Sequence, residues 1–213
     1  MTVVDIGANI GYYSLIAAKL VGKNGIVYAF EPEPRNYELL CKNIRVNGFS
    51  NVIPIKKAVS YKSGMSKLYY EKERIVNPSF SKENVLAASG HNILEKGGFI
   101  EEETISLDEF FRKVVGNSKV DVIKVDTEGA EGLMVDGSER ILRNNNLKMF
   151  LEFWPDGLRN MKSDPIKLLQ KLQEYGFKTK LINEAKMSLT QIENIKFYKN
   201  MIPGQRVDLL FEK

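Results

Sequence analysis

Short apolar runs alternate with segments of helical periodicity along the first half of the chain. Thr2–Ile6 is the first apolar run. Behind it, apolar residues recur at helical spacing, at Tyr13, Ile16, Ala17 and Leu20, and predict a helix. This alternation is typical of an α/β protein with a mostly parallel sheet, because each parallel connection needs a crossover.

The same pattern continues to the end of the chain. Six further runs predict strands, at Ile26–Phe30, Val52–Ile55, Val120–Val125, Leu147–Phe153, Phe177–Ile182 and Val207–Phe211. Helices are predicted from Pro34 to Gly48, over Leu107–Val115, over Ala130–Leu142 with a break at Asp136-Gly137, and from Pro165 to Gly176. We therefore expect a sheet of seven strands, without counting a weaker candidate at Ser66–Tyr70.

Residues 58 to 105 fit these patterns less clearly. Glu73 to Gly98 is polar and irregular, and a stretch of that length without evident structure is usually functional. No repeat or linker divides the chain, so we expect a single domain over 1–213 with an insertion around 60–105.

Composition narrows the class of protein further. The chain has 213 residues, of which 43% are hydrophobic and 27% charged, which is typical of a globular protein. No apolar run approaches the roughly 18 residues of a membrane span, and the start lacks the basic region of a secretory signal. Cys41 is the one cysteine, so we expect a reducing, cytoplasmic location. The net charge of +4 permits a nucleic-acid partner without requiring one.

A glycine-containing loop follows the first strand and opens the first helix. It reads Asp5-Ile-Gly7-Ala-Asn9-Ile-Gly11. Gly7 and Gly11 allow a tight turn and a close ligand approach, while the helix start offers unpaired N–H groups. The G-x-G core of a dinucleotide fingerprint is absent, which favours a ligand without a pyrophosphate. Asp5 stands where it could meet a cationic ligand.

Glu31 ends the second strand. An acid at this sheet edge can accept both hydroxyls of a ribose. The alternative is that Glu31 only caps the helix that Pro34 opens.

Four segments in order resemble the FkbM family of S-adenosylmethionine-dependent class I methyltransferases. They are DIGANIG, FEPEP, IKVDTEGAE and LEFWP, beginning at Asp5, Phe30, Ile123 and Leu151. The resemblance covers nearly the whole chain and implies a three-layer Rossmann-like fold, a seven-stranded mostly parallel sheet with an antiparallel last strand. Two features depart from the family: a short or missing segment before the first strand, and Thr127 in place of an aliphatic residue, from which we expect little consequence.

The resemblance also implies the cofactor site. Asp5, Gly7, Asn9, Gly11 and Glu31 would hold S-adenosylmethionine, Ala58 and Val59 would pass near its adenine, and Asp126 would face the methyl donor.

A group of acids follows the fourth and fifth strands. Asp126 and Glu128 come just after Val125, and Glu152 lies near the end of the fifth strand. Methyl transfer to a hydroxyl needs an aligned acceptor and a base, and crowded carboxylates raise one another's pKa values. We interpret Asp126 or Glu128 as the base and Glu152 as the group that orients the acceptor.

Three alternatives stay open for these acids. Glu131 in the same segment could only stabilise the start of its helix, and Glu152 could pair with a lysine. Asp126, Glu128 and Glu152 could instead hold Mg²⁺, which is possible but not favoured, and no His/Cys cluster offers a zinc site.

Two features of the irregular stretch have competing interpretations. His91, the one histidine, could be a base but is more commonly solvent-exposed when it lies alone in a loop. Asn77-Pro78-Ser79-Phe80 resembles the motif of amino-group methyltransferases, but that motif must end the fourth strand. We interpret it as a turn, which weakens the case for a DNA methyltransferase.

The sequence therefore predicts an O-methyltransferase acting on a hydroxyl of a sugar, a glycan or lipid-linked saccharide, or a secondary metabolite. An RNA methyltransferase, with Lys56, Lys57, Lys62 and Lys67 as its nearest approach to a basic face, is the first alternative. A non-catalytic S-adenosylmethionine-binding protein is the second. The acceptor and the oligomeric state are not determined by the sequence.

Overall fold

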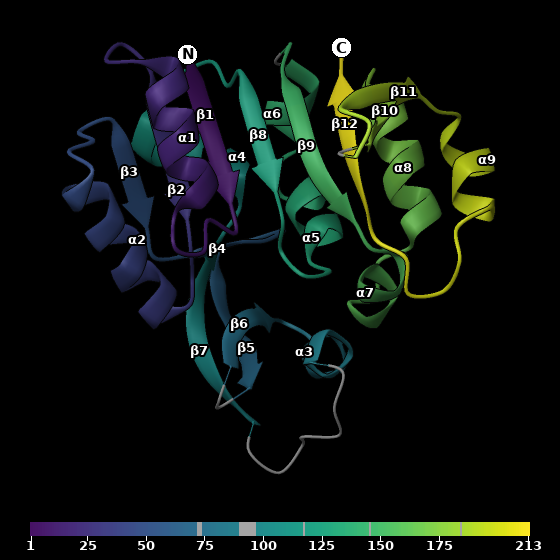
Figure 1. Cartoon of the computed structure of the whole chain (residues 1–213), viewed down its shortest axis with the longest axis horizontal. Helices are drawn as coiled ribbons and strands as arrows, with labels where there is room; N and C mark the ends of the chain where they lie inside the picture. Colours follow the sequence, from purple (N-terminus) through teal and green to yellow (C-terminus); the bar gives the residue numbers. More distant parts are fainter. Residues whose placement is uncertain (72–73, 90–96, 117, 145, 184) are drawn as a thin grey trace.

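The computed structural model contains two β-sheets, of which the larger forms the middle layer of the molecule (Figure 1). The structure describes residues 1–71, 74–89, 97–116, 118–144, 146–183 and 185–213. In spatial order the larger sheet consists of β11 (Ser188–Gln191), β10 (Lys178–Asn183), β12 (Val207–Glu212), β9 (Lys148–Phe153), β8 (Val122–Val125), β1 (Thr2–Ile6), β2 (Ile26–Phe30) and β3 (Val52–Ile55).

Strands β3, β2, β1, β8 and β9 pair in parallel, and the last strand, β12, runs antiparallel between β9 and β10. The predicted α/β class with its antiparallel last strand is confirmed. The sheet has eight strands instead of seven because β11 pairs with β10 as a hairpin. All four residues of β11 are exposed, so no buried apolar face marks this strand in the sequence.

Helices cover the two faces of this sheet as separate layers. On one face lie α1 (Tyr12–Val21) and α2 (Pro34–Val46), packed on a core that includes Val3, Val27 and Leu40. The core of the other face is formed with α4 (Leu107–Phe110), the π-helical turn Phe111–Val115, α5 (Glu131–Asp136), α6 (Glu139–Asn144) and α8 (Pro165–Glu174). Two short helices, α7 (Pro155–Asn160) and α9 (Asn194–Lys199), complete this part. Among the described residues, none of the helices combines the length and apolar character that a bilayer span requires.

Helix α1 forms where the apolar spacing predicts it, but its apolar stripe faces outward. Tyr13, Ile16 and Leu20 are exposed, whereas Ser14 and Ala18 are buried against the sheet. The Ser14 hydroxyl donates a 2.6 Å hydrogen bond to Asp5 on β1, so a buried polar pair fixes the rotation of this helix.

Strands within residues 58–71, 74–79 and 97–105 form a second, four-stranded sheet below the carboxyl ends of the parallel strands (Figure 1). Its strands are β4 (Ala58–Val59), β7 (Gly97–Ile105), β5 (Gly64–Glu71) and β6 (Arg74–Ser79), and α3 (Lys82–Ser89) follows β6. The prediction of an irregular stretch from Glu73 to Gly98 is therefore wrong for its described residues, which form β6, α3 and the start of β7, whereas the weaker strand candidate Ser66–Tyr70 is confirmed within β5. The sequence gives only a weak strand signal for β7, because this strand buries Glu102 and Thr104. Polar residues thus occupy positions that usually reveal an alternating apolar face.

The predicted turn at Asn77-Pro78-Ser79-Phe80 is also wrong. Ser79 pairs with Tyr69 across β6 and β5, so most of this segment is strand. The fourth parallel strand nevertheless ends at Val125, as predicted, and the segment does not occupy the position that an amino-group methyltransferase motif would need.

Candidate active site

A cavity of about 420 Å³ opens at the carboxyl ends of β1 and β2, the edge where parallel α/β sheets bind ligands. Leu68, Pro78 and Ser79 of the smaller sheet also line it, together with Phe80, which follows β6. Of the predicted site residues, the cavity lining includes Gly7, Asn9, Glu31, Ala58, Val59, Asp126 and Glu128. Asp5, Gly11 and Glu152 are not among the residues that line it.

The glycine loop takes left-handed backbone conformations at two glycines. Gly7 has φ +76°, and a Cβ atom there would lie 1.9 Å from the backbone oxygen of Asp126. Gly11 has φ +96°, and its Cβ would lie 2.7 Å from Leu40 Cδ1. The glycines therefore let the loop pass directly against β8 and α2, and bring the backbone of Ala8 and Asn9 to the cavity.

Replacing Gly7 with alanine is expected to lower the free energy of unfolding by more than about 3 kcal/mol. The left-handed backbone costs about 1–2 kcal/mol with a side chain, and displacing the Asp126 carbonyl adds to it. Gly48→Ala is the matched control, because Gly48 has φ +69° but no atom near its Cβ position. Urea denaturation of both variants measures the difference. Equal destabilisation would contradict the close approach.

Glu31 is buried at the floor of the cavity, with 4% of its surface exposed. Its two carboxylate oxygens accept hydrogen bonds from the backbone N–H of Asn9 (2.7 Å) and of Glu33 (2.9 Å). Burial raises its pKa to about 7, although the two backbone hydrogen bonds oppose this shift. The cap of α2 is Glu33, whose side chain accepts from the N–H of Asn36 (2.7 Å), so Glu31 is not the helix cap.

The raised pKa of Glu31 gives a stability that depends on pH. In the unfolded chain this carboxyl ionises near pH 4.5, whereas in the fold it keeps its proton until about pH 7. The native state therefore binds more protons between these values, and the free energy of unfolding falls as pH rises from about 4.5 to 7. One such group contributes at most about 1.4 kcal/mol per pH unit. We expect Glu31→Gln to flatten this dependence in denaturation curves at pH 5, 6 and 7. An unchanged slope would contradict the shift.

Asp5 lies on β1 beside Lys124 of β8, its partner in the parallel register. The Asp5 carboxylate accepts from Ser14 and lies 3.4 Å from Lys124 Nζ, which also donates to the Gly7 carbonyl (2.8 Å). Asp5 is thus committed to buried protein groups, and it supports the glycine loop from behind, through Lys124, without facing the cavity.

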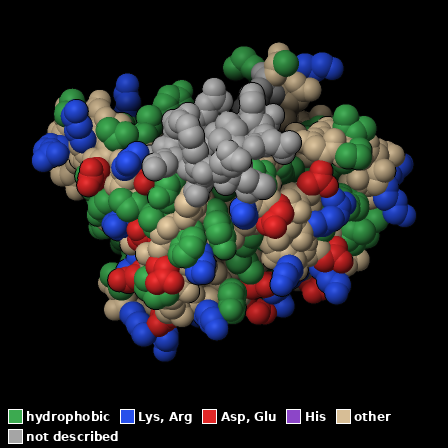
Figure 2. All heavy atoms as spheres, turned by 90° about the horizontal axis from the view of Figure 1, so that it is seen from below, with side chains coloured by type: hydrophobic (Ala, Val, Ile, Leu, Met, Phe, Trp, Pro, Cys, Tyr) green, Lys and Arg blue, Asp and Glu red, His purple; other side chains and the backbone are tan. Residues whose placement is uncertain are grey.

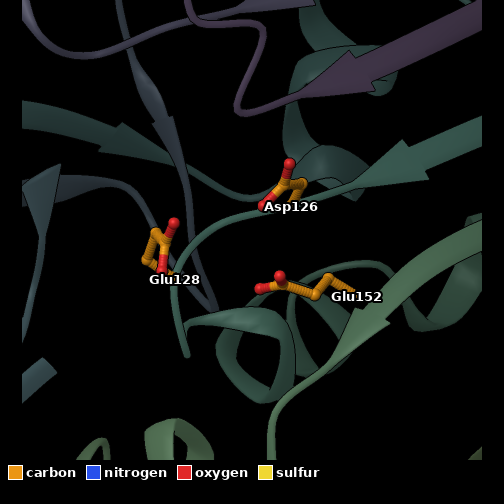
Figure 3. Close-up of side chains that lie close together, drawn as sticks. All are labelled: Asp126, Glu128 and Glu152. Carbon is orange, nitrogen blue, oxygen red and sulfur yellow. The ribbon is translucent and has the colours of Figure 1, made fainter. Parts of the chain in front are cut away.

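Asp126, Glu128 and Glu152 come together just past β8 and at the end of β9, as their places at the strand ends predict (Figure 3). One carboxylate oxygen from each lies within 4.8 Å of the others. Burial and the neighbouring Asp126 raise the pKa of Glu152 to about 7, and burial also raises the pKa of Glu128. The cluster therefore contains one carboxyl group, that of Glu152, that can take up a proton near neutral pH.

Two cationic side chains pair with the carboxylates of this cluster. Arg206 Nη1 lies 2.8 Å from Glu128 Oε2 and 3.4 Å from both oxygens of Glu152, and its guanidinium stacks 3.8 Å above the Trp154 ring. Lys124 Nζ lies 3.5 Å from Asp126 Oδ2. Of the alternatives left open for Glu152, pairing with a cation is present, but the partner is this arginine and not a lysine. Because each of the three carboxylates already has a protein cation beside it, the interpretation without Mg²⁺ stays the favoured one.

Glu131 acts within its own turn. Its side chain is fully buried, and Oε1 accepts from the N–H of Thr127 (3.1 Å), the hydroxyl of Thr127 (2.9 Å) and the N–H of Gly129 (3.1 Å). Glu131 therefore has the role considered as an alternative for it, which is to stabilise the start of its helix. Thr127 has more consequence than expected, because its hydroxyl donates to Glu131. His91 lies outside the described residues.

Lys124 and Arg206 are the residues that sequence reasoning missed. Lys124 has a signal: it is the charged residue of an otherwise apolar strand that must neighbour Asp5 in a parallel sheet. Arg206 has no such signal in the sequence, because it comes from the loop before β12. The Gly204 N–H donates to Asp156 (2.7 Å) and holds that loop.

Comparisons with known proteins identify the family of the chain. The family profile described as Methyltransferase FkbM domain matches residues 5–179. The methyltransferase SdnD of Sordaria araneosa is 28% identical over 185 aligned positions, which cover 74% of this chain and 68% of that protein. A tRNA(Phe) (4-demethylwyosine(37)-C(7)) aminocarboxypropyltransferase of Methanocaldococcus jannaschii is 49% identical over 53 residues, only 25% of this chain and 21% of that protein.

A solved structure shares the fold. The methyltransferase FkbM of Methylobacillus flagellatus superposes with a TM-score of 0.59 at 14% identity, over 99% of this chain and 43% of that one. The chain thus spans about a fifth of the aminocarboxypropyltransferase and less than half of this FkbM structure. The profile match extends from the glycine loop to β10 and includes both the Glu31 edge and the acid cluster. The chain belongs to the FkbM methyltransferase domain family.

Proposed function

We propose that this methyltransferase methylates a hydroxyl group of a sugar, a saccharide-bearing molecule or a secondary metabolite, with Glu128 as the general base. S-adenosylmethionine is the methyl donor, and when bound it supplies a methyl group activated by a positively charged sulfur. The observation that carries the proposal is one cavity that has Glu31 at one part of its lining and Asp126 with Glu128 at another.

The residues of the cavity fit this donor. Glu31 has acceptor capacity left on both oxygens for ribose hydroxyls, since each takes only one backbone hydrogen bond. Gly7 provides the close approach of the loop, and the buried Ala58 and Val59 offer an apolar wall for an adenine. The acid cluster complements the positive charge of the donor.

Glu128 is the best placed carboxyl for the acceptor. It lines the cavity, its pKa is raised by burial, and Arg206 holds its Oε2. When the acceptor oxygen forms its bond to the methyl carbon and the carbon–sulfur bond breaks, the hydroxyl proton passes to the Glu128 carboxylate. Lys124 pairs with Asp126 at the same edge of the sheet. Glu152 pairs with Arg206 and orients the acceptor.

The smaller sheet supplies the acceptor side of this proposal. Leu68, Pro78 and Phe80 give the cavity an apolar wall beyond the reach of the glycine loop, and Ser79 adds a hydroxyl. An acceptor with an apolar body and hydroxyl groups suits such a wall. We assign the acceptor site to this insertion on that basis.

An RNA acceptor is less well supported. Lys57 pairs with Glu103 and Lys56 lies 3.6 Å from Glu102 on β7, while Lys67 stacks over Phe99. Figure 2 shows positive and negative side chains interspersed over the described part of this face. Three of the four candidate lysines are therefore paired with side chains of β7, whereas an RNA site needs a basic surface with exposed aromatics.

The test is S-adenosylhomocysteine production from S-adenosylmethionine with a panel of hydroxyl acceptors, amines and RNA, at low and high salt. We expect turnover with a hydroxyl acceptor. Turnover only with RNA, lost steeply at high salt, would favour the first alternative. Cofactor binding without turnover on any acceptor would favour a non-catalytic binding protein.

A further inference from the structure

The backbone of Glu128 is in a conformation that a glutamate rarely adopts. Its φ is +53°, and Gly129 follows with φ +101°. A left-handed non-glycine residue persists where its surroundings determine it, and such residues concentrate at functional sites. Groups packed against this turn must therefore stabilise the left-handed backbone at Glu128.

Two side chains of the insertion hold the Glu128 carbonyl. The hydroxyl of Ser79 donates to this oxygen at 2.9 Å, and Asn84 Nδ2 donates to it at 2.8 Å. Asn84 lies on α3 and has no exposed surface. Its Nδ2 also packs on Gly129, where a Cβ atom would lie only 2.3 Å away.

The Asn84 amide has its orientation fixed on both sides. Nδ2 donates a second hydrogen bond to the Gly157 carbonyl at the start of α7 (3.1 Å), and Oδ1 accepts from Asn160 Nδ2 (2.8 Å). A rotated amide would bring its oxygen against two carbonyls and its NH₂ group against that of Asn160. The insertion, the turn after β8 and α7 thus meet at one buried side chain.

We propose that Asn84 is a positioning residue for methyl transfer, which fixes the backbone at Glu128 so that its carboxylate is held in the cavity beside Arg206. The inference rests on the proposed function only in taking Glu128 as the base. Because Asn84 and Ser79 belong to the insertion that lines the acceptor side, alignment of the base depends on the docking of that insertion.

The experiment compares Asn84→Leu with Asn51→Leu. Leucine has the same number and branching of side-chain heavy atoms as asparagine, forms no hydrogen bonds and adds no charge. Asn51 is a matched control because its Nδ2 also donates to two carbonyls, of Ala18 (3.1 Å) and Gly22 (3.0 Å), but at the opposite edge of the sheet. The readout is a carbon-13 NMR titration of the Glu128 carboxyl, assigned with Glu128→Gln, together with S-adenosylhomocysteine affinity by calorimetry.

In Asn84→Leu the Glu128 carboxyl is expected to move toward water, and its ionisation constant to increase by about threefold or more. Asn51→Leu leaves it unchanged, and the affinity for S-adenosylhomocysteine, which depends on Glu31, stays within about twofold in both. Ser79→Ala removes one of the two donors and gives a smaller shift in the same direction, which keeps the test valid if Asn84→Leu does not fold.

A Glu128 titration that is identical in wild type, Ser79→Ala and any folded Asn84→Leu would overturn the proposal, as would an equal shift in Asn51→Leu. If the wild type binds no S-adenosylhomocysteine, the proposed function fails, while the titration still decides whether Asn84 positions Glu128.

Discussion

Glu128→Gln is expected to lower the rate of methyl transfer by roughly 10²–10⁴-fold, the usual contribution of a positioned base. Glutamine keeps the shape of the side chain and can still accept a hydrogen bond from Arg206, but it cannot take the acceptor proton. The affinity for S-adenosylhomocysteine should be unchanged, so that the loss appears in kcat. Initial rates of S-adenosylhomocysteine formation, with calorimetry of the same protein, measure both quantities.

Glu139→Gln is the matched control for this variant. Glu139 forms the same kind of pair, 2.8 Å from Arg143 Nε, but on the exposed surface of α6. It should retain the wild-type rate. A Glu128→Gln protein with the wild-type rate would move the role of base to Asp126 or Glu152, and an equal loss in both variants would show that the change is not specific to the site.

Glu31→Ala is expected to weaken S-adenosylhomocysteine binding by at least roughly tenfold. At pH 8, above the pKa of about 7 of this carboxyl, the variant loses two ribose hydrogen bonds to a charged group, each worth about 1.5–3 kcal/mol, and leaves the N–H groups of Asn9 and Glu33 without their acceptor. Isothermal titration calorimetry measures the dissociation constant.

Glu33→Gln separates this effect from a general change in the loop. Glu33 is buried two residues away, but its carboxylate accepts from Asn36 at the start of α2, and it is absent from the cavity lining. The affinity of Glu33→Gln for S-adenosylhomocysteine should match that of the wild type. If Glu31→Ala also bound S-adenosylhomocysteine as the wild type does, the ribose would have to lie elsewhere.

The parallel sheet and the edge that carries the site could be predicted because they follow from local patterns. Buried strands such as Ile26–Phe30 are continuous apolar runs, and the acids after them, Glu31 and Asp126, must meet at one edge when the strands are parallel. The break between α5 and α6 at Gly137 was likewise visible in the sequence. These features need only knowledge of neighbours along the chain.

What could not be predicted depends on contacts between distant segments. Arg206 reaches Glu128 across 78 positions, and Asn84 reaches it across 44. Nothing in the residues around Arg206 or Asn84 marks them as partners of the acid cluster. The strand β7 was missed for a related reason, since Glu102 is buried beside Lys56 only once the two sheets are formed.

The placement of Asp5 shows the same limit at short range. Its position before the glycine loop suggested contact with a ligand, yet the side chain lies on the α1 side of β1, where Ser14 donates to Oδ2 and Lys124 Nζ lies 3.4 Å from Oδ1. The sequence identifies which acids reach the sheet edge, but the direction of each side chain depends on strand register and helix rotation.

A crystal structure with S-adenosylhomocysteine tests the central claim most directly. The account predicts ribose hydroxyls on the Glu31 carboxylate, the adenine beside Ala58 and Val59, and the sulfur atom facing Asp126 and Glu128 across the cavity. Density for the ligand outside this cavity, or within it but with Glu31 turned away from the ribose, would contradict the account.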